Sequence, residues 1–224
     1  MNARTGLLAA AMTAVASAFA GECTYSFAWF KNAPTTDFPV PVTLEEGVGG
    51  FSYAGFADAV GGTDLRVFDT DGTTPLACEI ENWNPSGKSV VWVKVPYFSK
   101  DTTLTLKWGA DAADAAAADA AGLWSGAVGV YHFAGQELKN AVNGDAMALV
   151  GSPVVHETGP LGNAARFDRT GNYSSTKLSD AHYGVVSNQF TISFWISTDN
   201  LKSDDKTYLF YYGKKSEQFA LLLN

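Results

Sequence analysis

Hydrophobic and polar residues alternate along several short stretches of this chain, which is the period of a β-strand. The clearest stretch covers residues 76–96, where two alternating runs flank the turn sequence Asn-Pro-Ser-Gly at residues 84–87. Two such runs joined by a turn predict a β-hairpin with one core face and one wet face. On this reading Glu79 falls opposite or near Lys94, and Glu81 lies beside Trp92.

The outer face of the predicted hairpin carries carboxylates next to aromatic rings. Glu79, Glu81, Trp83 and Trp92 share this face if the alternation is unbroken. An exposed indole beside carboxylates is a surface on which a sugar ring can stack, so these four residues are candidate ligand-binding residues. The alternative is structural: a second layer covers the tryptophans, and Glu79 pairs with Lys94 across the strands.

Four further alternating runs complete the first half of the chain, and they predict strands at residues 23–30, 38–44, 64–68 and 102–108. Pro39 and Pro41 lack the N–H groups that pair strands, so the second of these strands is expected at a sheet edge or a bulge. About six short strands separated by turns predict an all-β fold, with a β-sandwich at residues 21–109.

An Ala-rich segment at residues 110–122 separates the two halves. Its composition has high helix propensity and no large apolar face, which predicts a surface helix or a helical linker. Strand patterns resume within residues 123–224, at positions 129–133, 164–168, 189–198, 208–213 and 218–224. Because the sequence stops at Asn224 within an apolar strand pattern, we expect this chain to be a fragment of a longer protein or the product of a truncated gene model.

The first twenty residues have the pattern of a secretory signal peptide. Arg4 precedes an uncharged Ala-rich run, and Ala18-Phe19-Ala20 is a small-residue cleavage pattern, so we expect cleavage before Gly21. No later apolar run is long enough to span a bilayer. The protein is therefore expected to be exported to the periplasm, the cell surface or the extracellular space.

Composition and charge exclude nucleic acid as an expected partner. The chain has 15 basic and 23 acidic residues, and its longest basic run is Lys214-Lys215, whereas binding to phosphates needs clustered Lys and Arg. A hydrophobic content of 46% is ample for a packed core, and a charged content of 17% is typical of extracellular β proteins.

Four other residues are candidates for a disulfide or for metal binding. Cys23 and Cys78 share strand parity with core residues, so in an oxidising compartment they either form a disulfide or pack as two buried thiols. Asp69 and Asp71 supply clustered oxygens of the kind that calcium prefers. An Asp-Gly turn explains the same two aspartates without a metal.

Both halves resemble known families. The motifs FPVPVTL, DLRVFDTDG, EIENW, VVWVKVPYF and TLTLKWG are similar, in this order, to a β-sandwich domain of unknown function of bacterial exported proteins, which is sometimes associated with MotA/TolQ/ExbB proton channels. In the second half, GVYHF, GPLGNAARFD and NQFTISFWIST resemble the opening strands of laminin-G-like, concanavalin A-like jelly rolls. The resemblance implies a partial lectin-type domain at residues 123–224 and a calcium site in its loops.

Residues 79–84 also resemble the E-x-D-x-x-E strand of laminarinase-type glycosidases. Asn84 stands where that chemistry needs an acid to protonate the leaving group, so we expect no catalysis. The sequence therefore predicts an exported, non-catalytic module that binds carbohydrate or cell-surface glycans and adjoins further domains of the same chain. A structural spacer or a protein-binding surface subunit is the alternative, and a glycoside hydrolase is a remote one.

Overall fold

A computed structural model describes residues 19–109, 119–133, 138–151, 154–167, 173–175, 191–198, 207–214 and 217–223. The chain divides into two compact units, Met1–Val185 and Val186–Asn224, which are described separately. The expected signal peptide, apart from its last two residues, and residues 110–118 of the Ala-rich segment lie outside the described residues. In the part of the chain that is described, no helix is long and apolar enough to cross a membrane.

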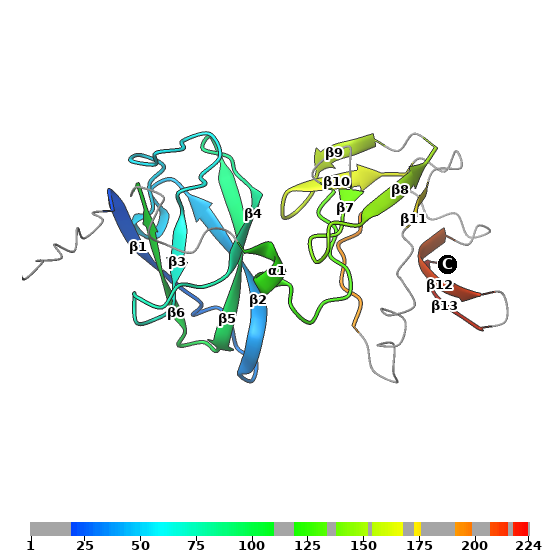
Figure 1. Ribbon diagram of the computed structural model, residues 1–224, viewed down its shortest axis with the longest axis horizontal. Helices are drawn as coiled ribbons and strands as arrows, with labels where there is room; N and C mark the ends of the chain where they lie inside the picture. Colours follow the sequence, from blue (N-terminus) through cyan, green and yellow to red (C-terminus); the bar gives the residue numbers. More distant parts are fainter. Residues whose placement is uncertain are drawn as a thin grey trace, which may run out of the picture. The chain divides into compact units, whose positions relative to one another are not determined.

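The first half of unit 1 contains two antiparallel sheets of three strands each, in the orders β1-β6-β3 and β2-β5-β4 (Figure 1). The strands are β1 (Gly21–Ser26), β2 (Thr35–Glu45), β3 (Arg66–Phe68), β4 (Cys78–Asn82), β5 (Lys88–Phe98) and β6 (Thr103–Trp108), with a short 3-10 helix at Val48–Gly50. Every strand expected in this half is present. The expected all-β fold is thereby confirmed for this part of the chain.

The core lies between these two sheets because alternate side chains of each strand point inward. Val91, Val93 and Val95 of β5 are fully buried, and Leu104 and Leu106 of β6 face them from the other sheet. Burying large aliphatic side chains stabilises a fold by about 1.5–3 kcal/mol each. The remaining buried core residues are Phe27, Val40, Val42, Leu44, Phe51, Phe56, Leu65, Val67, Leu76, Cys78, Phe98 and Trp108.

Strand β2 lies at the edge of its sheet among the described strands, as its prolines predict. It pairs with β5 along its whole length, with Pro39 opposite Lys94 and Pro41 opposite Trp92. The other partner of β5 is β4, so the predicted hairpin forms the rest of this sheet.

The register of the hairpin differs from the expected one. Glu79 lies opposite Trp92, not opposite Lys94, and a bulge interrupts the pairing between Ile80 and Asn82. A β-bulge places one extra residue on one strand and changes the side on which the following side chains lie. The residues beyond the bulge therefore leave the face predicted by simple alternation.

Among its described residues, the rest of unit 1 contains one short helix and smaller antiparallel sheets. Helix α1 spans only Ala120–Leu123, and its N-cap Asp119 accepts a hydrogen bond from the N–H of Gly122. The strands that follow are β7 (Leu138–Lys139), β8 (Ala146–Val150), β9 (Val154–Thr158), β10 (Asn163–Arg166) and β11 (Tyr173–Ser175), in the orders β11-β8-β7 and β10-β9. The expected strand at residues 129–133 is absent, because this segment has no strand pairing.

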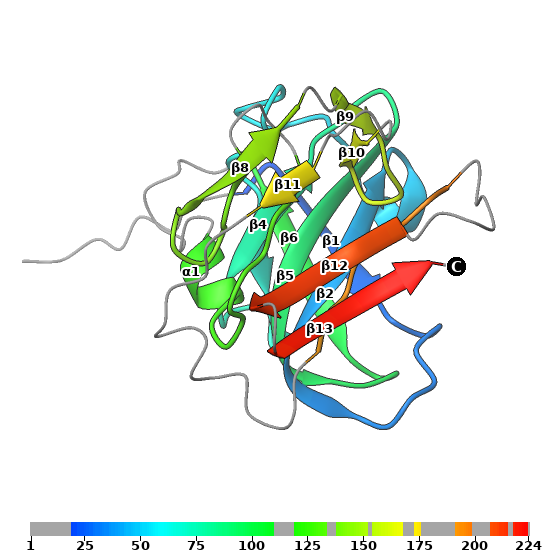
Figure 2. The same cartoon turned by 90° about the vertical axis from the view of Figure 1, so that its right-hand side faces the viewer.

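Unit 2 contains one hairpin, in which β12 (Thr207–Lys214) pairs with β13 (Glu217–Leu223) (Figure 2). Both strands were expected from their alternating patterns. Residues 191–198, the described part of the strongest predicted strand in this half, do not form one. Trp195 is 74% exposed within this segment.

Candidate functional site on the central hairpin

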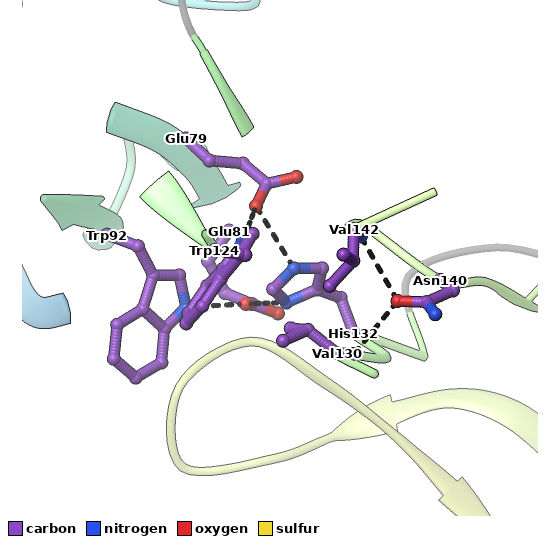
Figure 3. Close-up of polar contacts among 8 residues, drawn as sticks. All are labelled: Glu79, Glu81, Trp92, Trp124, Val130, His132, Asn140 and Val142. Atoms are coloured by element: carbon purple, nitrogen blue, oxygen red, sulfur yellow. Dashed lines mark hydrogen bonds and ion pairs between the residues drawn. The ribbon is translucent and has the colours of Figure 1, made fainter. Parts of the chain in front are cut away.

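Two carboxylates of strand β4 bind the same histidine ring. The Nε2 atom of His132 lies 3.1 Å from Oε2 of Glu79, and its Nδ1 atom contacts Oε2 of Glu81 (Figure 3). Successive outward-facing residues of a strand are two positions apart, which is why both glutamates lie on one face. When both ring nitrogens carry protons, His132 donates one hydrogen bond to each carboxylate.

Two indole rings complete the cluster. Trp124, directly after α1, donates a hydrogen bond from Nε1 to Oε2 of Glu79 at 2.6 Å, and Trp92 of β5 donates from Nε1 to Oε2 of Glu81 at 2.8 Å. The two rings meet edge to face, with centroids 5.3 Å apart. Each carboxylate therefore accepts one indole and one imidazole N–H through a single oxygen atom.

Burial and charge fix the protonation of this cluster. The side chains of Glu81, His132 and Glu79 are 6%, 17% and 24% exposed. Burial lowers the pKa of His132, but the hydrogen bonds and charges of Glu79 and Glu81 outweigh it and raise the pKa to about 9. Burial likewise raises the pKa of Glu79, and the hydrogen bonds from His132 and Trp124 outweigh it, so that pKa lies below its ordinary value. At neutral pH the ring is an imidazolium bound to two carboxylates.

Further polar contacts hold the segment around α1 against the hairpin. The N–H of Asp119 donates to the carbonyl oxygen of Cys78, and Nζ of Lys94 donates to the carbonyl oxygen of Gly122 at 3.2 Å and also contacts Oγ of Ser125. Lys94 thus binds the chain after the Ala-rich segment and does not pair with Glu79. The expected Glu79–Lys94 pair is wrong, because Glu79 lies opposite Trp92, which is two residues before Lys94 on β5.

Asn140 supports the loop that carries His132. Its side chain is buried, and its Oδ1 atom accepts hydrogen bonds from the N–H groups of Val130 at 3.0 Å and Val142 at 3.1 Å. Its Nδ2 atom donates to the carbonyl oxygen of Val128. One buried amide therefore fixes the backbone just before His132, as Figure 3 shows.

The cluster has the chemistry of a closed polar network. Both outer-face glutamates bind protein N–H groups, and no group of three His, Cys, Asp or Glu within the described residues is arranged to hold a metal ion. Asn84, where a glycosidase would carry an acid, lies in the hairpin turn, and its Oδ1 atom accepts from the N–H of Ser86. A retaining mechanism needs a nucleophile and an acid facing a common substrate, and the amide of Asn84 cannot serve as that acid.

The four candidate ligand-binding residues do not form one open surface. Trp92 shares the outer face with the two glutamates, as predicted, but Trp124 packs against it. Trp83 lies on the opposite side, because the bulge after Ile80 turns it toward the core. There its ring contacts Phe56, and its Nε1 atom donates to the carbonyl oxygen of Ala59 at 3.2 Å.

The two aspartates considered for calcium shape a turn. Oδ1 of Asp71 accepts the N–H groups of Thr73 and Thr74 at 2.8 Å, and Asp69 accepts the N–H of Thr70 at 2.7 Å. The hydroxyl of Thr74 donates to Oδ2 of Asp71, and this bond, with the N–H groups of Thr74 and Thr73, lowers the pKa of Asp71 to about 2. Gly72 follows with a φ of 68°, a value that glycine adopts without strain.

The two cysteines are free thiols on facing sheets. Cys23 pairs with Leu106 on β1 and β6, and Cys78 pairs with Val93 on β4 and β5. Burial raises the pKa of both thiols to about 11, with the charge of Glu22 adding to the effect at Cys23. The structure has no disulfide between them, and they contribute to the core as small apolar side chains.

His132, Trp124 and Asn140 were not predicted as site residues. His132 is 53 positions from Glu79, and the chain reversal that joins them leaves no spacing signal in the sequence. The sequence did contain one chemical indication. Glu79 and Glu81 face outward on a largely apolar hairpin, and carboxylates that another segment covers need cationic or N–H partners. No pattern in the sequence named which ones.

The fold and site define an all-β protein in which a sheet hairpin binds a following segment through buried polar groups. Residues 61–143 match the model of a family described as Domain of unknown function (DUF2341). The match includes both glutamates, both outer-face tryptophans and His132. No match was found among curated proteins or solved structures, and none supports the expected laminin-G-like or lectin domain.

Proposed function

We propose that this chain is a non-catalytic structural module of an exported protein, a spacer that holds and presents the chain that follows it. The single observation that carries this proposal is the cluster of Glu79, Glu81 and His132. These residues bind one another across 53 positions of sequence, and they leave no open, convergent set of polar groups for a substrate.

The contacts on both sides of the cluster support this role. Trp124 and His132, which follow the Ala-rich segment, bind the hairpin through N–H groups, and Lys94 of the hairpin binds back to Gly122. Charge-assisted hydrogen bonds of this kind each contribute about 1.5–3 kcal/mol when both partners are held in place. The segment is therefore fastened at both its start and its end.

The family match also supports a single module that includes both sides of the cluster. It runs from residue 61 to residue 143, and so it contains the hairpin and the segment that binds to it. The expected boundary near residue 109 falls inside this match. We propose that the module extends beyond the Ala-rich segment, and that a jelly roll follows it.

Export to the periplasm, cell surface or extracellular space belongs to the same proposal, on the basis of the signal pattern at residues 1–20. The expected partners are further domains of the full-length chain. Calcium binding in the second half stays a prediction of the resemblance.

Thermal unfolding of paired variants distinguishes a structural cluster from a ligand site. Replacing a residue that serves ligand binding often leaves the stability of the fold unchanged or raises it. Replacing a residue of a structural network lowers the stability. We expect Glu81→Gln and Trp92→Phe to lower the melting temperature of the chain beginning at Gly21, and exposed Lys88→Gln to leave it unchanged. Unchanged melting in the first two variants would contradict the proposal.

A further inference from the structure

One end of the sandwich carries features that the polar cluster does not use. Ser26 at the end of β1 lies opposite Thr103 at the start of β6, and Phe98 at the end of β5 lies opposite Thr35 at the start of β2. Three connections therefore meet at this end, at residues 27–34, 69–77 and 99–102 (Figure 1). The polar cluster lies elsewhere, on the outer face of the hairpin.

A depression of about 600 Å³ opens at this end between two of the connections. Tyr97 and Pro96 line it on one side, and Asp69, Asp71 and Asp101 line it together with hydroxyl groups of the same turns. Tyr97 is 59% exposed, and it lies on β5 between exposed Pro96 and buried Phe98. An aromatic ring that opens onto convergent polar groups is the usual composition of a small-molecule site.

Two more large aromatic side chains are exposed at the same end. Trp29 is 59% exposed and Phe38 is 46% exposed. Both rings contact buried phenylalanines of the core. Trp29 packs edge to face with Phe27, with centroids 6.1 Å apart, and Phe38 lies parallel to Phe98, with centroids also 6.1 Å apart. The exposed faces of these rings are therefore fixed by the core.

The turn beside Tyr97 is also rigid. The hydroxyl of Thr102, a buried residue, donates to the carbonyl oxygen of Tyr97 at 3.0 Å and accepts the N–H of Ser99 at 2.9 Å. The carboxylate of Asp71 is held by the N–H groups of its own turn. A ligand that bound here would meet groups already in position, which reduces the entropic cost of binding.

The lining residues select the class of ligand. A carboxylate has about four acceptor positions, and Asp69 uses one of them for the N–H of Thr70, so hydroxyl donors find acceptors here. Three carboxylates line the depression, and one of them, Asp101, forms an ion pair with the neighbouring Lys100. The remaining excess of negative charge disfavours nucleic acids, anionic lipids and acidic polymers. The chain carries a net charge of −8, which adds to this repulsion.

We propose that the end of the sandwich around Tyr97 is a binding site for a neutral polysaccharide. The apolar face of a sugar ring stacks on Tyr97, and its hydroxyl groups donate to Asp69 and Asp101. Phe38 and Trp29 lie outside the lining of this depression. This site is separate from the four residues first considered for ligand binding.

Affinity electrophoresis tests the site with named polymers. The chain beginning at Gly21 is run through native gels that contain a soluble β-1,3-glucan, xylan, galactomannan or amylose, with alginate as the anionic comparison. We expect at least one neutral polymer to retard the chain and alginate not to. Tyr97→Ala is expected to weaken this retardation about tenfold, the magnitude of one lost aromatic contact.

Val60→Ala is the matched control, because Val60 is 87% exposed in the loop that contacts Trp83 at the opposite end of the sandwich. It should leave the retardation unchanged, and both variants should unfold like the parent chain. The proposal is overturned if a folded chain passes all four neutral polymers unretarded, if alginate alone retards it, or if Tyr97→Ala binds as the parent does. Self-association through the aromatic end without polymer binding, seen by sedimentation, overturns it equally.

Discussion

Glu79 and Glu81 lie two residues apart on β4 and bind opposite nitrogen atoms of one imidazole ring, that of His132. Each of the two acceptor oxygens also receives an indole N–H, from Trp124 and Trp92 respectively. The arrangement places two negative charges and one positive charge in a mostly buried cluster. Its stability therefore depends on every member keeping its partner.

Removing the imidazole should destabilise the protein strongly. In His132→Ala both carboxylates lose their cation while they remain partly buried, so we expect a loss of about 2–4 kcal/mol in the free energy of unfolding. Urea denaturation followed by fluorescence measures this loss. Lys100→Ala, at an exposed ion pair with Asp101, is the control and should change stability by less than about 1 kcal/mol. Similar losses in both variants would show that the cluster contributes little.

The pH dependence of stability follows from the raised pKa of His132. The folded-state pKa is about 9, above the ordinary value of 6.5, so the stabilisation is fully present below pH 6.5 and is lost as pH rises through 9. We expect the free energy of unfolding to fall by on the order of 3 kcal/mol over this window. His132→Gln should flatten the curve. A wild-type curve that is already flat between pH 6.5 and 9 would contradict the assignment.

The bond between Trp124 and Glu79 can be measured by a double-mutant cycle. Trp124→Phe keeps an aromatic ring and removes the N–H, and Glu79→Gln removes the charge that accepts it. We expect a coupling energy of about 1–2 kcal/mol, since the bond joins an N–H to a buried charge. A cycle between Trp124→Phe and Asp145→Asn supplies the control, which should show additive effects. Additivity in the first cycle would mean that the contact is not formed in solution.

The segment after the Ala-rich stretch should stabilise the sandwich. A chain of residues 21–109 retains both sheets but leaves Trp92 and the two glutamates uncovered. We expect it to unfold at a lower temperature than a chain of residues 21–151, which keeps Trp124 and His132. Differential scanning calorimetry compares the two. Equal melting temperatures would place the structural boundary at residue 109.

The state of the cysteines is open to a direct chemical assay. Because Cys78 is buried, Cys23 is half-buried and both thiols have pKa values of about 11, the native chain should react slowly with a thiol-specific aromatic disulfide reagent. Unfolding without a reductant should release two reactive thiols per chain. Release of none would reveal a bond between Cys23 and Cys78.

The strands were predictable from sequence because the two-residue period depends on local residues alone. Val91, Val93 and Val95 indicated the core face, and Pro39 and Pro41 indicated the sheet edge. The bulge after Ile80 was not visible, because a single extra residue leaves no pattern, and it reversed the direction of the side chains beyond it. The partners of the glutamates were not visible either, because they depend on how distant parts of the chain meet.

The prolines of β2 affect how readily molecules of this protein aggregate when they are close together. An unprotected sheet edge offers a row of donors and acceptors on which a second molecule can add a strand, and repeated addition leads to insoluble aggregates. With Pro39 and Pro41 at alternate positions, part of the donor row of this edge is missing. If many copies are crowded together after export, this edge resists the strand-by-strand growth that begins a fibril.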